Sequence, residues 1–107
     1  MTKYVFMVTI YALFHPLTND PFYVGSTSQK LSSRLGGHLN NMEGVKEKQA
    51  ILLMAKQQKL KIEIVPLLVC PEKVAVKCET YIYHLLIKNG YTLHQQERRL
   101  HRKKIKP

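Results

Sequence analysis

Two short blocks near the N-terminus decide the fold of this chain, Thr9-Ile10-Tyr11 and Tyr23-Val24-Gly25. The first block belongs to residues 4–13, a run rich in Val, Ile, Tyr and Phe, which favour β-strands. Residues 15–21 (HPLTNDP) contain the turn formers that interrupt a strand, and residues 22–25 resume the extended pattern. We therefore expect a β-hairpin with a long connecting loop.

Helical spacing of apolar residues follows the hairpin. Leu31, Leu35 and Leu39 lie four residues apart, so they share one face of a predicted helix. Gly44 separates this helix from a second one, which is expected over residues 45–60. The buried side of the second helix is predicted to contain Ala50, Ile51, Leu53 and Met54.

The last third of the chain predicts one strand and one helix. Residues 62–69 form an apolar, β-branched run, and Pro66 within it places that strand at an edge or at a bulge. Pro71 suits the first turn of a helix, and Gly90 suits its end. The order β-β-α-α-β-α predicts an α+β domain over residues 1–94, in which helices cover a small sheet. Residues 95–107 are expected to form a basic C-terminal tail.

The charge of the chain predicts a polyanionic partner. Seventeen Lys and Arg oppose seven Asp and Glu in 107 residues, which gives a formal net charge of +10. Much of the excess lies in the tail, where Glu97 alone opposes Arg98, Arg99, Arg102, Lys103, Lys104 and Lys106. A phosphate-binding arm and a solvated terminus fit this pattern equally well.

Other compositional features exclude several classes. No apolar run reaches the roughly 18 residues that a transmembrane helix requires, and no signal peptide is recognised, so we expect a cytoplasmic or nuclear protein. Cys70 and Cys78 are too few for a disulfide framework. We expect Cys78 to be a buried free thiol, with zinc ligation by both cysteines and a histidine as a minor alternative.

Five side chains form a set suited to metal-assisted cleavage of a phosphodiester. Tyr11 and Tyr23 can point to one side of the hairpin, and a phenol beside a metal and a guanidinium loses its proton more easily. Arg34 and His38 share a helix face, where arginine can bind phosphate oxygens and histidine can exchange a proton. Each of these pairs taken alone is more often an ordinary strand pair or a solvated helix face.

Glu79 is the most distinctive member of the set. It falls on the apolar side of the last helix, where a carboxylate is costly unless it is paired or binds a metal. Pairing with Lys77 or Lys88, or simple exposure, is the alternative to a metal site. A single carboxylate with several waters would suit Mg²⁺.

The hairpin blocks, the Arg34 and His38 pair and Glu79 together resemble the GIY-YIG nuclease family over about residues 4–94. The resemblance implies a three-stranded antiparallel sheet flanked by helices. It also implies that Tyr11 orients or activates the attacking water, with support from Tyr23, and that Glu79 binds one Mg²⁺ or Mn²⁺. The positions of Arg34 and His38 imply binding of the scissile phosphate.

This chain departs from the family pattern at three points. Thr9 replaces the first glycine, and the step from Tyr23 to Arg34 is one residue longer than in most members. Many members have an asparagine shortly after the last helix, where this chain has residues 91–96 (YTLHQQ). Either His94 or Gln95 supplies the hydrogen bond of that asparagine, or the role is absent.

The function predicted from the sequence is a divalent-metal-dependent endonuclease that hydrolyses DNA with little sequence specificity of its own. Branched, flapped or nicked DNA and non-specific duplex are the favoured substrates, and repair or recombination is one biological setting among several. The residues expected to contact DNA phosphates are Arg34, Arg98, Arg99, Arg102, Lys103 and Lys104. The alternatives are a non-catalytic nucleic-acid-binding module and a nuclease subunit that needs a partner chain, with a homodimer also left open.

Overall fold

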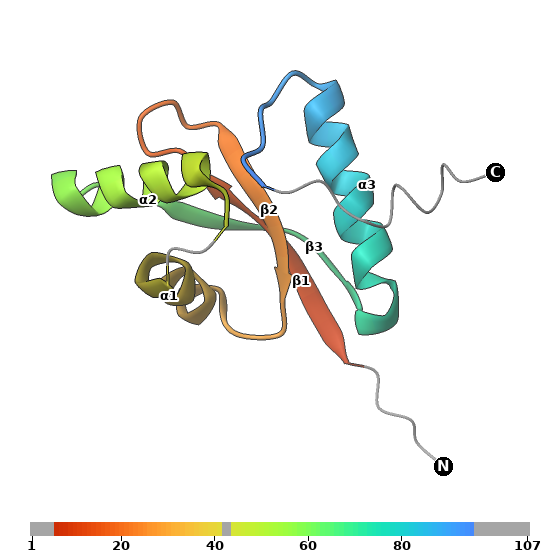
Figure 1. The fold of residues 1–107 in the computed structure, drawn as a ribbon. Coiled ribbons are helices and arrows are strands. Elements are labelled where there is room, and N and C mark those ends of the chain that lie inside the picture. The colour runs from red at the N-terminus through yellow and green to blue at the C-terminus, as the bar shows by residue number, and fades with distance from the viewer. Residues whose placement is uncertain (1–5, 42–43, 96–107) are drawn as a thin grey trace, which may run out of the picture.

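The structure is a computed structural model that describes residues 6–41 and 44–95. Its elements are β1 (Met7–Phe14), β2 (Pro21–Thr27), α1 (Leu31–Asn41), α2 (Lys46–Gln58), β3 (Glu63–Pro71), the 3-10 turn η1 (Glu72–Val74) and α3 (Ala75–Lys88). The α+β class and the order β-β-α-α-β-α predicted from the sequence are confirmed (Figure 1).

The three strands form one antiparallel sheet in the order β2-β1-β3. Tyr11, in the middle of β1, lies opposite Gly25 of β2 and opposite Pro66 of β3. The register between β1 and β3 shifts at this point, so that Leu67 has no partner across the pair. Pro66 was expected at an edge or at a bulge, and the outer strand β3 provides both.

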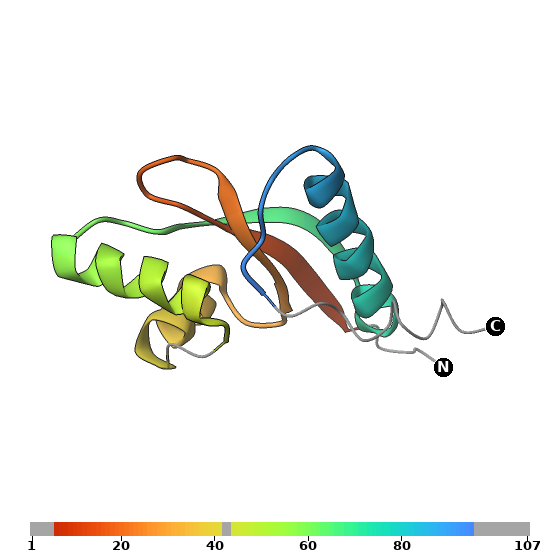
Figure 2. The ribbon, with the colours of Figure 1, turned by 45° about the horizontal axis from the view of Figure 1, so that its top comes forward.

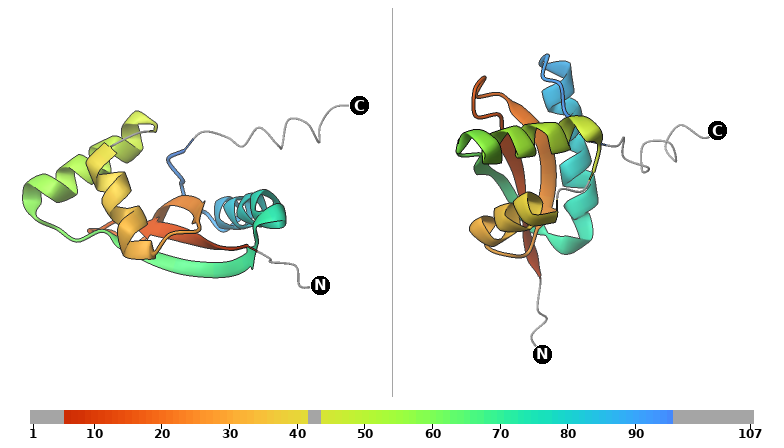
Figure 3. Two further views of the ribbon diagram at one scale, coloured as in Figure 1. Left: turned by 90° about the horizontal axis from the view of Figure 1, so that it is seen from below. Right: turned by 60° about the vertical axis from the view of Figure 1, so that its left-hand side comes forward.

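The central strand β1 is buried on both faces of the sheet. Its side chains at Val8, Ile10 and Ala12 belong to a core on the α3 side, and those at Tyr11 and Leu13 belong to a core on the side of α1 and α2. The helices accordingly lie in two groups, with α1 and α2 together and α3 apart from them (Figures 1 and 3). The strand carrying Tyr11 is thus held from both sides.

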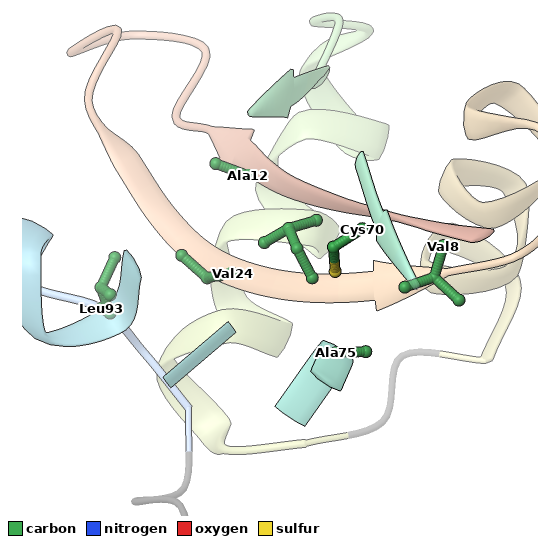
Figure 4. Packing of buried hydrophobic residues seen from close by; sticks show 7 residues of the cluster. Val8, Ala12, Val24, Cys70, Ala75 and Leu93 are labelled. Atoms are coloured by element: carbon green, nitrogen blue, oxygen red, sulfur yellow. The ribbon is translucent and has the colours of Figure 1, made fainter. Parts of the chain in front are cut away.

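The core on the α3 side draws on every strand. Val24 from β2, Cys70 from β3, Ala75 from α3 and Leu93 join the β1 side chains there (Figure 4). Each large apolar side chain buried in this way contributes roughly 1.5–3 kcal/mol to folding. This core fixes α3, and with it Glu79, against the sheet.

The predicted buried side of α2 is partly wrong. Ala50 and Leu53 are exposed, and the buried residues of this helix are Lys48, Leu52 and Ala55. The run of six apolar residues from 50 to 55 covers more than one face of a helix, so the run alone does not select the inward face. The observed rotation brings a lysine, Lys48, into the interior.

The chain beyond α3 turns back along the sheet. Gly90 has a φ of +94° and follows the end of the helix, as predicted. The backbone N–H of His94 then donates to the carbonyl oxygen of Phe22 at 2.7 Å, which places residues 91–95 beside β2 (Figure 2). The Gln95 side chain therefore lies within reach of the strand that carries Tyr23.

Neither cysteine is part of a disulfide or a metal cluster in the described chain. Cys70 is buried and Cys78 is half-buried beside it, and both are free thiols. Burial, reinforced by the contact with Cys78, raises the pKa of Cys70. No group of three or more His, Cys, Asp or Glu is arranged for a metal within residues 6–41 and 44–95, which removes the zinc alternative there. In the same residues, every helix is too short or too polar to cross a bilayer.

Candidate active site

The site is built around the phenol of Tyr11, which is fully buried. The side chain leans over its cross-strand partner Gly25: a Cβ at position 25 would lie 2.6 Å from the Tyr11 oxygen. Such a separation does not occur for real Cβ atoms, so the position accepts only glycine while Tyr11 stays in place. The glycine of the second sequence block thus makes room for the phenol.

Helix α1 supplies the two partners of that phenol. The Nε–H of Arg34 donates to the Tyr11 oxygen at 3.1 Å, and the same oxygen lies 2.7 Å from Nε2 of His38. Leu31, Leu35 and Leu39 pack on the core shared by α1 and α2, as their spacing predicted, and this packing fixes the orientation of α1. Arg34 and His38 lie one helical turn apart on the same face of α1, and this face is thereby directed at Tyr11.

Tyr23 and Lys48 complete the wall beside His38. The ring centroids of Tyr23 and His38 are 5.0 Å apart, and those of Tyr23 and Tyr11 are 6.3 Å apart. The ammonium Nζ of Lys48 lies 4.3 Å from the centroid of the Tyr23 ring, a distance at which a cation is attracted to the aromatic face. The two tyrosines therefore share one site, as the hairpin pattern predicted.

Burial sets the protonation states of this cluster. Desolvation, followed by the neighbouring Tyr23, raises the pKa of Tyr11 to about 12, against the lowering effect of Arg34. Removal of the phenol from water outweighs the effect of one guanidinium, so the protein groups alone do not make Tyr11 easy to ionise, and the ionisation expected from the sequence would depend on a nearby metal. Tyr11 is a neutral phenol at pH 7.

Burial also keeps His38 neutral. Desolvation first, and then the positive charges of Lys48 and Arg34, lower the pKa of His38 to about 3. For Arg34, burial disfavours the charge, but the hydrogen bond to Tyr11 and the two neighbouring phenols outweigh it and raise the pKa of the guanidinium. A charged Arg34 donating to the Tyr11 oxygen leaves the phenol proton free to be donated to the neutral imidazole.

Arg34 and His38, the two partners of Tyr11, open onto a pocket of about 260 Å³, and the buried Tyr11 lies behind them outside the lining of the pocket. Its wall is predominantly polar and includes two cations from different helices, Arg34 from α1 and Lys48 from α2. The lining residues are Tyr23, Arg34, Gly37, His38, Asn41, Gly44, Val45, Lys48, His94 and Gln95. Such a pocket suits a phosphate group.

Glu79 approaches the site from the other helix group. It is only 4% exposed, and its negative charge contributes to the raised pKa of Tyr11, so the carboxylate lies within electrostatic range of the phenol. It does not line the pocket that Arg34 and Lys48 share. Four of the five predicted side chains therefore lie in direct contact, and the fifth lies nearby on α3.

Two contributors were missed or left open by the sequence. Lys48 was not singled out from the sequence, because it lies among good helix formers. Its spacing of four and seven residues from Leu52 and Ala55 places it on the same helix face as those buried residues, and this spacing could have identified it. Gln95 was one of two candidates for the missing asparagine. Its side-chain oxygen accepts from the Val24 N–H at 2.7 Å and its amide donates to the Val24 oxygen at 3.1 Å.

The predicted DNA-binding residues of the tail lie outside the described part of the chain, which ends at Gln95. They are Arg98, Arg99, Arg102, Lys103 and Lys104. Their contact with DNA stays a prediction.

Comparison with protein families identifies the domain to which these elements and site residues belong. The model of the GIY-YIG catalytic domain matches residues 7–92, which include every element from β1 to α3 and all five residues of the predicted site. No curated protein and no solved structure matches the chain. The chain belongs to the GIY-YIG catalytic domain family.

Proposed function

We propose that this protein is a divalent-metal-dependent endonuclease that hydrolyses DNA phosphodiester bonds with little sequence preference of its own. A GIY-YIG catalytic domain implies a nuclease with a nucleic-acid substrate. The observation that carries the proposal is the continuous hydrogen-bonded chain from Arg34 through Tyr11 to His38, beside a cationic pocket. Water, proton acceptor and phosphate would meet at this point.

In the proposed reaction Tyr11 and His38 move one proton away from the attacking water. The water oxygen forms a bond to phosphorus as the bond from phosphorus to the leaving oxygen breaks. The water proton passes to the Tyr11 oxygen and the phenol proton passes to Nε2 of His38, while the leaving oxygen takes a proton from solvent. The 2.7 Å separation of these two atoms suits such a transfer. Because the phenol gains one proton as it loses another, the high pKa of Tyr11 does not oppose the step.

Arg34 would stabilise the charge that develops at phosphorus. Its guanidinium lines the pocket, donates its Nε–H to Tyr11 and also interacts with Tyr23, and its pocket-facing edge would contact a phosphate oxygen. Removal of one such electrostatic donor typically costs about 3–4 kcal/mol of transition-state stabilisation, or 10²–10³ in rate. Tyr23 would limit the movement of His38 through ring contact.

The donor set fits one hard cation. Glu79 is a buried carboxylate near Tyr11, and the described residues contain no cluster of three or more protein ligands, as zinc would need. Mg²⁺ and Mn²⁺ tolerate a single carboxylate because water fills their remaining positions. When bound, the cation would polarise the phosphate and lower the charge on the leaving oxygen.

DNA is the favoured substrate, and a non-catalytic binding module is the rival function. A net charge of +10 supports binding in both cases. A buried glutamate within electrostatic range of the phenol favours catalysis, because a binder of a polyanion gains nothing from a buried negative charge. A partner subunit or a homodimer would complete a structure-specific enzyme and would show as activity only in the assembled form.

The test is cleavage of plasmid and branched DNA with Mg²⁺ or Mn²⁺, and with chelator. We expect metal-dependent nicking by the parent protein, and its loss in Glu79→Ala and in Arg34→Ala. Glu79→Ala should lose Mn²⁺ binding while it keeps or gains DNA affinity, whereas Arg34→Ala should keep Mn²⁺ binding. Lys56→Met, at an exposed position of α2, is the matched control and should cleave like the parent. No nicking of any substrate, with equal DNA binding by all variants, would favour the rival function.

A further inference from the structure

Lys48 is a buried lysine in the wall of the site. It is 4% exposed, lies in the first turn of α2 and lines the pocket together with Arg34 and His38. Burial of an ammonium group costs free energy, so lysine is almost never buried without compensation. Lys56 lies two to three turns further along the same helix and is exposed to solvent, so it serves as a comparison for Lys48.

The surroundings of Lys48 hold its ammonium group in one place. Nζ lies 4.3 Å from the centroid of the Tyr23 ring. On another side the chain passes close at Gly44, where a Cβ would lie 3.3 Å from Cδ and 3.5 Å from Nζ of Lys48. Gly44 has a φ of +103°, a conformation that L side chains rarely adopt. The backbone at Gly44 and the aromatic ring together fix the position of the charge.

Lys48 and Arg34 act on the same space from two helices. Both line the pocket together with His38, and both positive charges act on the His38 imidazole. The start of α2 at Val45 has no side-chain cap and also borders the pocket, so it adds partial positive charge. Two fixed cations that converge on a polar pocket are suited to a doubly coordinated phosphate.

We propose that Lys48 is a substrate-binding residue that contacts the scissile phosphate opposite Arg34, so that the two cations hold different non-bridging oxygens. This inference rests on the proposed nuclease function. Lys48 belongs to α2, a helix that contributes none of the five site residues predicted from the sequence. The bound phosphate would also offset the positive charge that disfavours protonation of His38, which would link substrate binding to proton acceptance.

Binding of thymidine 3′,5′-bisphosphate, a minimal phosphate ligand that needs no cleavage, tests the inference. Calorimetry in chelator on the parent protein, Lys48→Met, Lys48→Arg and Lys56→Met gives four affinities. We expect Lys48→Met to bind about 10- to 100-fold more weakly, in line with loss of one hydrogen bond to a charged group. Lys48→Arg should retain most of the affinity, and Lys56→Met should equal the parent. Equal affinity of Lys48→Met and the parent would overturn the inference.

A second measurement on the unaltered protein covers the case in which Lys48→Met does not fold. The ¹³Cε resonances of Lys48 and Lys56 are followed by NMR during titration with the bisphosphate, after assignment with Lys48→Arg and Lys56→Met. A saturating shift at Lys48 with none at Lys56 supports the inference, and an unmoved Lys48 resonance overturns it. A parent protein that binds the bisphosphate through Lys48 but cuts no DNA would refute the nuclease proposal and leave this binding site standing.

Discussion

Tyr11 and Gly25 face each other across the β1–β2 pair, and the phenol oxygen of the first occupies the space where a Cβ of the second would lie, 2.6 Å away. The same oxygen receives the Arg34 hydrogen bond and lies beside His38. The geometry of the site thus depends on the absence of a Cβ atom at Gly25, because that absence leaves room for the Tyr11 oxygen.

Gly25→Ala should therefore abolish the proposed cleavage activity while it leaves the fold intact. The added methyl displaces the Tyr11 ring and separates its oxygen from Arg34 and His38, and a misplacement of about 1 Å can cost 10²-fold in rate. We expect kcat/KM to fall by about 100-fold or more, measured by plasmid nicking. Gly36→Ala is the matched control, because a Cβ there meets nothing within 4 Å. It should cleave normally and stabilise α1 by about 1 kcal/mol. Normal cleavage by Gly25→Ala would contradict the close packing of the phenol.

Neutral His38 should make the folded protein sensitive to acid. Its pKa is lowered from 6.5 to about 3, so between these values the unfolded chain binds a proton that the folded chain does not. Stability then falls as the pH falls from 6.5 toward 3, by up to about 1.4 kcal/mol per pH unit from this group. His38→Gln should show a shallower decline in urea unfolding measured from pH 7 to pH 4. Parallel curves for the two proteins would show that His38 is protonated in the folded state.

Gln95→Ala should destabilise the sheet through β2. The variant loses both hydrogen bonds between the side chain and the Val24 backbone, each of which contributes about 0.5–1.5 kcal/mol. We expect the free energy of unfolding to fall by about 1–2 kcal/mol. Gln57→Ala, at an exposed position of α2, serves as the control and should change stability by less than about 0.5 kcal/mol. An unchanged unfolding midpoint for Gln95→Ala would mean that water replaces the side chain without loss.

Truncation after Gln96 should weaken DNA binding mainly through electrostatics. The deleted segment contains Arg98, Arg99, Arg102, Lys103, Lys104 and Lys106, which lie outside the described residues. Each phosphate contact adds about 0.9 to the slope of log affinity against log salt, so loss of about three to five contacts should flatten the slope by about three to four units. Cleavage at saturating DNA should persist, because all five site residues precede the deletion. Identical slopes in a salt series would mean that the tail makes no phosphate contacts.

The sequence could predict the elements because their signals are local. The hairpin follows from the turn formers of residues 15–21, and α1 follows from the spacing of Leu31, Leu35 and Leu39. The position of Pro66 was also predictable, since a missing N–H restricts proline to an edge or a bulge wherever it occurs in a sheet. Local chemistry decides each of these features.

The remaining features depend on how separate elements meet. The inward rotation of α2, which brings Lys48 to Tyr23, is set by packing in the core that α2 shares with α1 and the sheet, and not by its own apolar run. The raised pKa of Tyr11 likewise reflects the depth of burial, which the sequence does not express. The hydrogen bonds of Gln95 to the Val24 backbone likewise depend on the path of the chain beside β2, which no local pattern in residues 91–95 expresses.

The two-sided burial of β1 restricts which substitutions this protein can accept. Tyr11 sits between Ile10 and Ala12, both fully buried, and those neighbours pack on the opposite face from the phenol. Directed evolution for altered substrates would find almost no neutral substitutions from Ile10 to Leu13, since each one disturbs a packed interior. Productive variation would instead accumulate on the exposed sides of α1 and α2, where the pocket wall can be reshaped while the strand that carries the phenol stays fixed.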